Sequence, residues 1–196
     1  MQKIGTDVYV LDTHGHSAIL SNTRLILFDT GIEEDATRLL AEMQITGYKP
    51  TDVQNIILTH RHMDHIAGLK KMKTLVDAKV ACHELDADVI GAIDDRLTDS
   101  QIYEGFLVIH TPGHTEGNIA LLDQEADLLI AGDSFRNDPD GLNHMPDNYN
   151  NDPVQHRQSI KKLANFNFST AIVGHGDPVE GDASNLLKSL INKNGW

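Results

Sequence analysis

The sequence predicts a layered α/β fold with mixed β-sheets. Short apolar runs, rich in β-branched and aliphatic residues, recur along the chain and are typical of strands. Amphipathic stretches with helical periodicity separate the later runs. The N-terminal runs follow one another closely, as in hairpins, whereas the later runs alternate with helical stretches. This order favours mixed sheets covered by helices.

The expected strands and helices follow directly from these two patterns. The strands cover residues 7–11, 17–20, 24–29, 55–59, 78–82, 106–110, 118–122, 127–132 and 170–174. The helices cover residues 33–43, 66–76, 83–93, 152–166 and 182–193. The fourth helix has a clear start, because Asp152 can cap its first turn and Pro153 suits the first helical position.

Length and composition favour one domain over residues 1–196. The hydrophobic content of 40% is ordinary for a globular protein and leaves material for a core. No apolar run approaches the roughly 20 residues that span a bilayer, and the N-terminus lacks the pattern of a signal peptide. The single cysteine, Cys82, cannot form an internal disulfide, which agrees with a reducing compartment. A cytoplasmic location is therefore predicted.

The formal net charge of −13, with histidine counted as neutral, narrows the range of partners. Binding of phosphate groups depends on clustered Lys and Arg, so we expect neither nucleic acid nor an anionic membrane as the main partner. A small-molecule substrate is favoured. The sequence does not indicate an oligomeric state.

Histidine and aspartate residues follow four of the expected strands. The stretch "LTHRHMDHIAG" places His60, His62, Asp64 and His65 after the strand at 55–59. The three other positions are His114 in "TPGH", Asp133 in "AGD" and His175 in "GHG". Loops at the carboxyl ends of strands are where α/β sheets commonly build their sites. For a lone histidine, a hydrogen-bonded core or surface role is the better explanation, but that explanation fails for the clustered set.

Imidazole and carboxylate donors without thiolate indicate a catalytic metal site rather than a structural zinc. Seven donors are too many for one tetrahedral ion but suit two adjacent ions that share a carboxylate and a water. His60 and His62 can point the same way in an extended segment, and Asp64 with His65 begins the next turn. One pair can therefore serve one ion and the next pair its neighbour. We expect two Zn²⁺ ions per chain, with iron or manganese as alternatives.

The motifs resemble those of the metallo-β-lactamase superfamily. "THRHMDHIAG" resembles the family's HxHxDH signature, and "LFDTG", "TPGHTEGN", "AGD" and "GHG" occur in the family's order. The resemblance covers most of the chain, and five motifs in order are very specific. It implies a four-layer αββα sandwich of two mixed β-sheets packed face to face, with a dinuclear site at one edge.

The resemblance also implies a role for each donor. His60, His62 and His114 would bind the first metal; Asp64, His65 and His175 would bind the second; and Asp133 would bridge both. Asp29 in "LFDTG" matches a family residue that does not bind metal but hydrogen-bonds to the ligands, since carboxylates orient metal-binding histidines. A role for Asp29 as a turn former at the end of a strand is equally compatible.

Several branches of the family are disfavoured by what this sequence lacks. Cys82 lies in no ligand motif, which argues against lactamases with a cysteine ligand, and the net charge argues against the nucleic-acid branches. Glyoxalase II (hydroxyacylglutathione hydrolase) shares the full ligand set, but only a short segment follows "GHGDPV" where that family has a helical domain. Persulfide dioxygenases need fewer ligands. Quorum-signal lactonases share the ligands and have a tyrosine near the metals, for which Tyr149 is a weak match.

The remaining interpretation is a dinuclear metallohydrolase that cleaves a small ester, thioester or lactone. A metal-bridging hydroxide, held by Asp64, would attack the carbonyl group. Two segments are expected to line the substrate pocket, "DTHGHSAIL" and the turn-rich stretch 134–152, because such loops commonly decide specificity. The candidate substrate contacts are His14, His16, Arg136, His144 and Tyr149. Asn118 has two explanations, an oxyanion donor or a strand-start residue.

Three function classes remain open at this point. The first is the dinuclear hydrolase, of which a glyoxalase II-type glutathione thioesterase is one variant. The second is an iron-dependent redox enzyme of the same fold, because sequence spacing cannot choose the ion. The third is a binding module that has lost its chemistry, which the intact ligand set disfavours.

Overall fold

A computed structural model describes residues 1–15, 17–21 and 24–196. In it the chain forms two compact units. The first unit comprises Met1–Cys82 with Ala87–Arg96, and the second comprises His83–Asp86 with Leu97–Trp196. A single domain over residues 1–196 stays a prediction.

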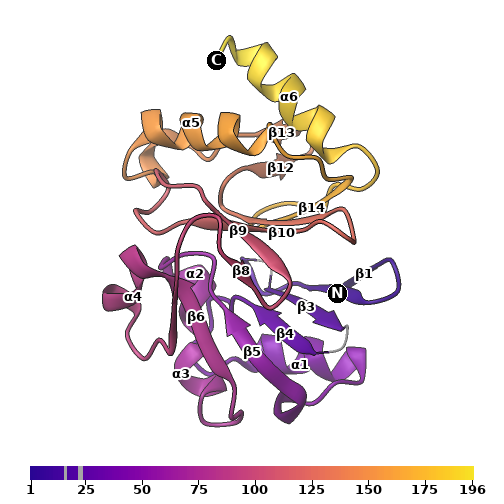
Figure 1. The fold of residues 1–196 in the computed structure, drawn as a ribbon. Helices are drawn as coiled ribbons and strands as arrows, with labels where there is room; N and C mark the ends of the chain where they lie inside the picture. The colour runs from indigo at the N-terminus through magenta and orange to yellow at the C-terminus, as the bar shows by residue number, and fades with distance from the viewer. Residues whose placement is uncertain (16, 22–23) are drawn as a thin grey trace. The chain divides into compact units, whose positions relative to one another are not determined.

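The first unit is built on a mixed sheet whose described strands run in the order β1 to β7 (Figure 1). Its strands are β1 (Gln2–Ile4), β2 (Val8–Leu11), β3 (Ser17–Ser21), β4 (Leu25–Phe28), β5 (Val53–Ile57), β6 (Lys79–His83) and β7 (Asp95–Leu97). β2, β3 and β4 pair antiparallel, as the close spacing of the expected strands predicted; β1, which was not expected, pairs antiparallel with β2; and β4, β5 and β6 pair parallel. All four residues of β4 are buried, as is usual for strands within a covered sheet.

Helices cover the sheet of the first unit. They are α1 (Thr37–Thr46), the 3₁₀ helix η1 (Pro50–Asp52), α2 (Met63–Ile66) and α3 (Leu69–Met72), and α4 (Glu84–Ile90) contributes residues to both units. Leu39 and Met43 of α1 and Met72 of α3 belong to the same buried cluster as Leu27 and Ile56 of the sheet. The apolar faces of these helices therefore supply the core of this unit.

Two of the expected helices differ from the structure. The helix expected at 33–43 begins only at Thr37, because Ala36 has a φ of 53° and lies in the left-handed region. The helix expected at 66–76 is two short helices, α2 and α3. Between them Gly68 has a ψ of −9°, and a Cβ there would lie 2.5 Å from the carbonyl oxygen of Thr30. At Gly68 the chain passes so close to another backbone segment that no Cβ fits, which is why glycine stands between the two helices.

The second unit contains a five-stranded mixed sheet in the order β14-β11-β10-β9-β8. Its strands are β8 (Ile102–Tyr103), β9 (Phe106–His110), β10 (Ile119–Asp123), β11 (Leu128–Gly132) and β14 (Thr170–Val173). β11 pairs parallel with β14 and antiparallel with β10. Together the two units confirm the prediction of mixed sheets.

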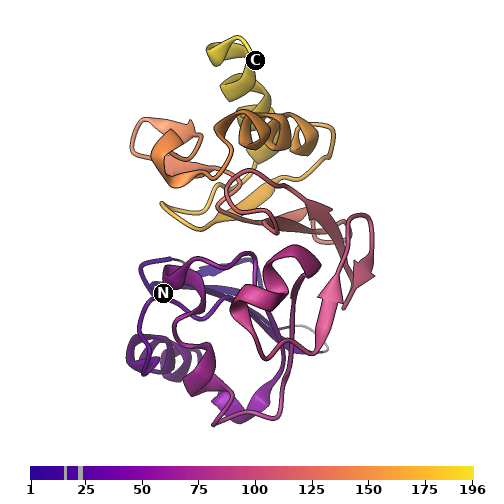
Figure 2. The ribbon, with the colours of Figure 1, turned by 90° about the vertical axis from the view of Figure 1, so that its left-hand side faces the viewer.

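Two long helices cover one side of this second sheet (Figures 1 and 2). They are α5 (Pro153–Leu163) and α6 (Ala183–Asn194), and their buried residues share a cluster with those of β11 and β14. The Asp152 side chain accepts hydrogen bonds from the backbone N–H groups of Val154 and Gln155, which confirms the predicted cap. None of the described helices is both long and apolar enough to cross a membrane.

The segment 134–152 is more ordered than its composition suggested. It contains a hairpin of β12 (Arg136–Asp138) and β13 (Gly141–Asn143), followed by the 3₁₀ helix η2 (Asp147–Tyr149). Such short polar strands have no apolar alternation, so they could not be recognised from the sequence.

Candidate metal centre

The first group of predicted ligands lies in the segment that follows β5. His60 precedes α2, His62 is its N-terminal flanking residue, and Asp64 and His65 lie within it. His60 and His65 are fully buried, and the His60 ring centroid lies 4.9 Å from that of His62 and 4.1 Å from that of His65. The potential ligand atoms of His60 and His62 lie within 4.8 Å of one another, as do those of Asp64 and His65. These four side chains thus form two pairs of potential metal ligands.

The buried carboxylate of Asp29, directly after β4, orients two of these histidines. His65 Nδ1 lies 2.8 Å from Asp29 Oδ2. The Thr59 hydroxyl donates to the same oxygen at 2.9 Å, and His60 Nδ1 lies 3.0 Å from that hydroxyl. Because the hydroxyl hydrogen is donated to Asp29, the Thr59 oxygen accepts from His60 Nδ1. Both histidines therefore carry hydrogen on Nδ1, and Nε2 is the atom able to bind a metal.

Three further predicted ligands follow strands of the second unit. His114 lies in the loop after β9, Asp133 directly follows β11, and His175 follows β14. Asp133 is buried, and its Oδ2 lies 3.1 Å from His114 Nε2 and 3.4 Å from His175 Nε2. One carboxylate oxygen that faces two imidazole nitrogens is the arrangement that a bridging role requires.

The loop that carries His114 is fixed by buried side chains around it. Asn118 Nδ2 donates to the Thr111 carbonyl and hydroxyl oxygens, at 3.2 and 2.8 Å, and to Ser134 Oγ at 3.0 Å. Asn118 therefore stabilises the loop rather than acting as an oxyanion donor, because its amide hydrogens are directed at Thr111 and Ser134. This network also links the His114 loop to Ser134, the residue after Asp133.

Two residues important for this loop were missed by the sequence analysis. The fully buried Asp86 accepts hydrogen bonds from the Thr115 hydroxyl at 2.7 Å and from the Gly117 backbone N–H at 2.9 Å. Asn150 Oδ1 lies 3.0 Å from His114 Nδ1. Neither residue belongs to a motif, and each is more than 25 positions from its partner, so no local pattern indicated them.

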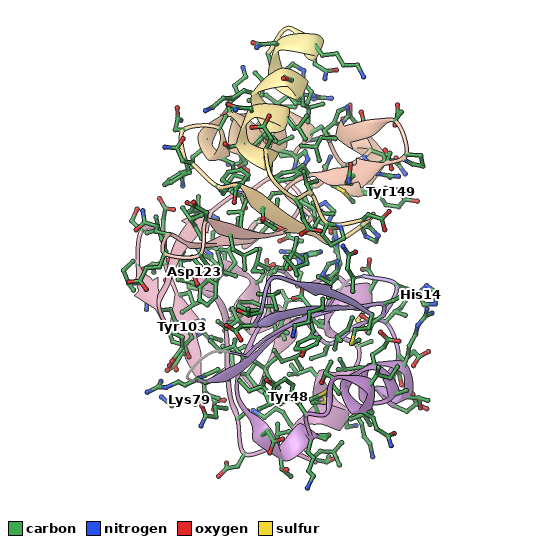
Figure 3. The ribbon with its side chains drawn as sticks, turned by 90° about the vertical axis from the view of Figure 1, so that its right-hand side faces the viewer. His14, Tyr48, Lys79, Tyr103, Asp123 and Tyr149 are labelled. Atoms are coloured by element: carbon green, nitrogen blue, oxygen red, sulfur yellow. The ribbon has the colours of Figure 1, made fainter. Side chains whose placement is uncertain are left out.

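Most of the residues predicted to contact substrate interact with other side chains of their own unit. His14 is exposed on the first unit (Figure 3), where Arg38 Nη1 lies 2.6 Å from its Nε2. Arg136 pairs with Asp138, and the His144 ring lies 5.3 Å from that of Trp196, edge to face. Tyr149 is 61% exposed (Figure 3). Their contact with substrate stays a prediction, and His16 lies outside the described residues.

A buried histidine outside the predicted ligand set, His83, titrates abnormally. Its ring stacks on that of His110, with centroids 3.9 Å apart and an interplanar angle of 10°. Burial, and secondly the positive charge of His110, lower the pKa of the His83 imidazole from 6.5 to about 4. His83 is therefore neutral in the folded protein at neutral pH.

We expect the second unit to lose stability as the pH falls from about 6.5 to about 4, in part because of His83. Over this range the unfolded chain binds a proton at His83 that the folded chain excludes, so protonation favours unfolding. The contribution of this single group is on the order of 3 kcal/mol. Urea unfolding of the parent and of His83→Gln at several pH values measures it. The variant should show a shallower loss of stability in acid; equal slopes would contradict the assignment.

This chain is similar to known proteins in sequence and in fold. A family model described as the metallo-beta-lactamase superfamily matches residues 6–175. A hydroxyacylglutathione hydrolase from Ectopseudomonas mendocina is 32% identical over 134 residues, which are 66% of this chain but only 49% of that relative.

Two solved structures are similar over nearly the whole chain. The metallo-beta-lactamase family protein TTHA1429 from Thermus thermophilus has a TM-score of 0.76 at 21% identity, covering 96% of this chain and 79% of that chain. TTHA1623, solved in a di-iron-bound form, has a TM-score of 0.68 at 26% identity, covering 95% of this chain and 91% of that chain. These similarities confirm the expected fold of two main sheets with helices.

Proposed function

This chain belongs to the metallo-beta-lactamase superfamily, and from this premise we propose that it hydrolyses a small ester, thioester or lactone. It is a metalloenzyme of this fold with His and Asp ligands of the dinuclear type. The observation that carries the proposal is the orientation of three histidines. His60, His65 and His114 each place Nδ1 against an oxygen acceptor. This is the outer hydrogen bonding typical of metal-binding histidines.

The donor set fits a metal ion. With the Nδ1 hydrogen of His114 directed at Asn150, the Nε2 of the neutral ring presents a lone pair to Asp133 Oδ2, 3.1 Å away. A lone pair and a carboxylate oxygen at this distance repel unless a proton or a metal ion lies between them. Buried groups of this kind are found where a cation is coordinated.

In the proposed site, the ligands divide as the family resemblance implies. His60, His62 and His114 would hold one ion, and Asp64, His65 and His175 would hold the second, with Asp133 contacting both. When bound, two such ions acidify water and polarise a carbonyl group. Asp64 would accept a hydrogen bond from the attacking water and hold it toward the carbonyl carbon. Water and the ester bond are consumed, and the acid and the alcohol or thiol are released.

A glutathione thioester is the second candidate substrate. It is favoured by the hydroxyacylglutathione hydrolase that is 32% identical to this chain. Because only 49% of that relative is matched, the segments that complete its own site need not be represented here. We therefore place glutathione thioesters within the thioester class to be tested rather than as the main proposal.

The proposal is tested on the full chain loaded separately with zinc and with iron. Metal content per chain is measured first, and hydrolysis is then assayed on esters, thioesters including a glutathione thioester, lactones, lactams and phosphodiesters. We expect hydrolysis in one of the first three classes, loss on chelation and recovery with zinc. Full metal occupancy without any hydrolysis would overturn the proposal. Oxygen consumption by the iron-loaded form alone would replace it with a redox function.

A further inference from the structure

We propose that Asn150 is a positioning residue that sets the tautomer of His114 and thereby presents its Nε2 to the metal. The inference rests on the proposed function for its metal, but its geometry lies wholly within the second unit. Asn150 follows η2 and belongs to the stretch 134–152, which the sequence suggested for substrate recognition. We assign this part of the stretch to support of the ligand instead.

The orientation of the Asn150 amide is fixed by its neighbours. Its Nδ2 donates to the carbonyl oxygens of Met145 at 3.0 Å and Pro146 at 3.3 Å. A carbonyl oxygen only accepts, so the nitrogen must face these two groups. The amide oxygen therefore faces His114 Nδ1, at 3.0 Å.

The consequence for His114 follows from the donor and acceptor inventory. An amide oxygen cannot donate, so His114 must carry its hydrogen on Nδ1 to form this bond. In the neutral ring, Nε2 is then the acceptor atom, and it is the nitrogen that faces Asp133. The opposite tautomer would place two acceptors against each other at Asn150 and a hydrogen where the metal would bind.

The backbone around Asn150 holds it in place against the His114 loop. The Asn151 N–H donates to the His114 carbonyl oxygen at 3.2 Å, and the Asp152 N–H donates to the Gly113 carbonyl oxygen at 2.9 Å. Gly113 has a φ of 122°, and a Cβ there would lie 2.2 Å from the His156 nitrogen. The two segments are therefore in close contact, and the backbone beside Asn150 is held against the His114 loop, while the Asn150 amide is held by the carbonyl oxygens of Met145 and Pro146.

Two variants separate positioning from a purely structural role. Asn150→Ala removes both the acceptor for His114 and the donors for the loop carbonyls. Asn150→Asp keeps an acceptor for His114 Nδ1 but loses the donors. The matched control is Asn151→Ala, since that side chain binds only Glu116 among the contacts described, at the exposed surface of the same loop.

The first readout uses no metal and no substrate. Nitrogen NMR of histidine-labelled apoprotein, at a pH where the rings are neutral, reports which nitrogen of His114 carries hydrogen; a His114→Gln variant assigns the signal. We expect the Nδ1–H tautomer in the parent, in Asn150→Asp and in Asn151→Ala, and a mixture in Asn150→Ala. A parent His114 with hydrogen on Nε2 would overturn the proposal, even if Asn150→Ala does not fold.

The second readout is zinc affinity, measured by competition with a chromophoric chelator. We expect Asn150→Ala to bind zinc about 10–100-fold more weakly, as is typical when an outer hydrogen-bond partner is lost. Asn150→Asp and Asn151→Ala should stay within a few-fold of the parent. Equal losses in Asn150→Ala and Asn150→Asp would mean that the loop contacts matter and the tautomer does not. If the tautomers behave as expected but the parent hydrolyses nothing, only the proposed function fails.

Discussion

Replacement of Asp133 by asparagine is expected to lower the occupancy of both metal ions together. Asp133 Oδ2 faces His114 Nε2 and His175 Nε2, at 3.1 and 3.4 Å. Because these two histidines are the proposed ligands of different ions, the same oxygen lies beside both proposed ion positions. A neutral amide is a poorer ligand for a divalent cation than a carboxylate and places an N–H group against one side of the site. Loss of a residue that only hydrogen-bonds a metal ligand typically lowers activity by roughly 10–100-fold. Because Asp133 is itself a proposed ligand, we expect the rate of hydrolysis to fall by more than that.

Elemental analysis after equilibration with excess zinc at neutral pH measures the effect. We expect two ions per parent chain and a loss of more than one ion in Asp133→Asn. Asp123→Asn is the matched control, because Asp123 caps a surface turn through the N–H groups of Glu125 and Ala126 and an asparagine can do the same. A parent that binds only one ion under metal excess would defeat the dinuclear assignment. A variant that keeps two ions would remove Asp133 from the bridging role.

Much of the fold was predictable because its core strands are apolar and its turns are marked. The strand expected at 106–110 is β9, and the cap at Asp152 begins α5 as expected. The prediction was wrong where tertiary contact overrides a local pattern. The amphipathic stretch 66–76 has helical periodicity, yet α2 ends at Ile66 and α3 covers only Leu69–Met72, with Gly68 packed against the Thr30 carbonyl oxygen between them. Periodicity carries no information about such an approach.

In the candidate site, too, some residues could be predicted from the sequence and others could not. The potential ligands were recognisable because their residue types recur after strands in a known order. The residues that orient them were harder to find, since they act across long sequence separations. Asp29 was found because it lies in a motif of the family to which a role could be assigned. Thr59 lies in the quoted signature stretch without an assigned role, and Asn150 lies in no motif, so only their hydrogen bonds reveal what they do. A polar residue in a turn-rich loop looks the same in sequence whether it faces solvent or a ligand.

Asp64→Asn is expected to keep the fold and lose most turnover. Asp64 lies in the first turn of α2 and its side chain is 28% exposed, so an isosteric amide can be accommodated without disturbing the core. In the proposed mechanism its carboxylate accepts a hydrogen bond from the attacking water and also binds the second ion. An amide accepts more weakly on one side and donates on the other, so the water loses its orientation. We expect a 10²–10⁴-fold loss, the range typical of a positioned acid–base group.

The decisive quantity is turnover per bound metal pair, because a simple loss of metal would also lower activity. Metal content and kcat are therefore measured on the same sample, with unfolding by urea as the test of the fold. Asp77→Asn makes the same chemical change at an exposed position of the same unit and should leave turnover unchanged. If Asp64→Asn loses metal and turnover in proportion, Asp64 acts only as a ligand. If its turnover per metal pair stays near that of the parent, the attacking water is held by another group and Asp64 does not have the role proposed for it.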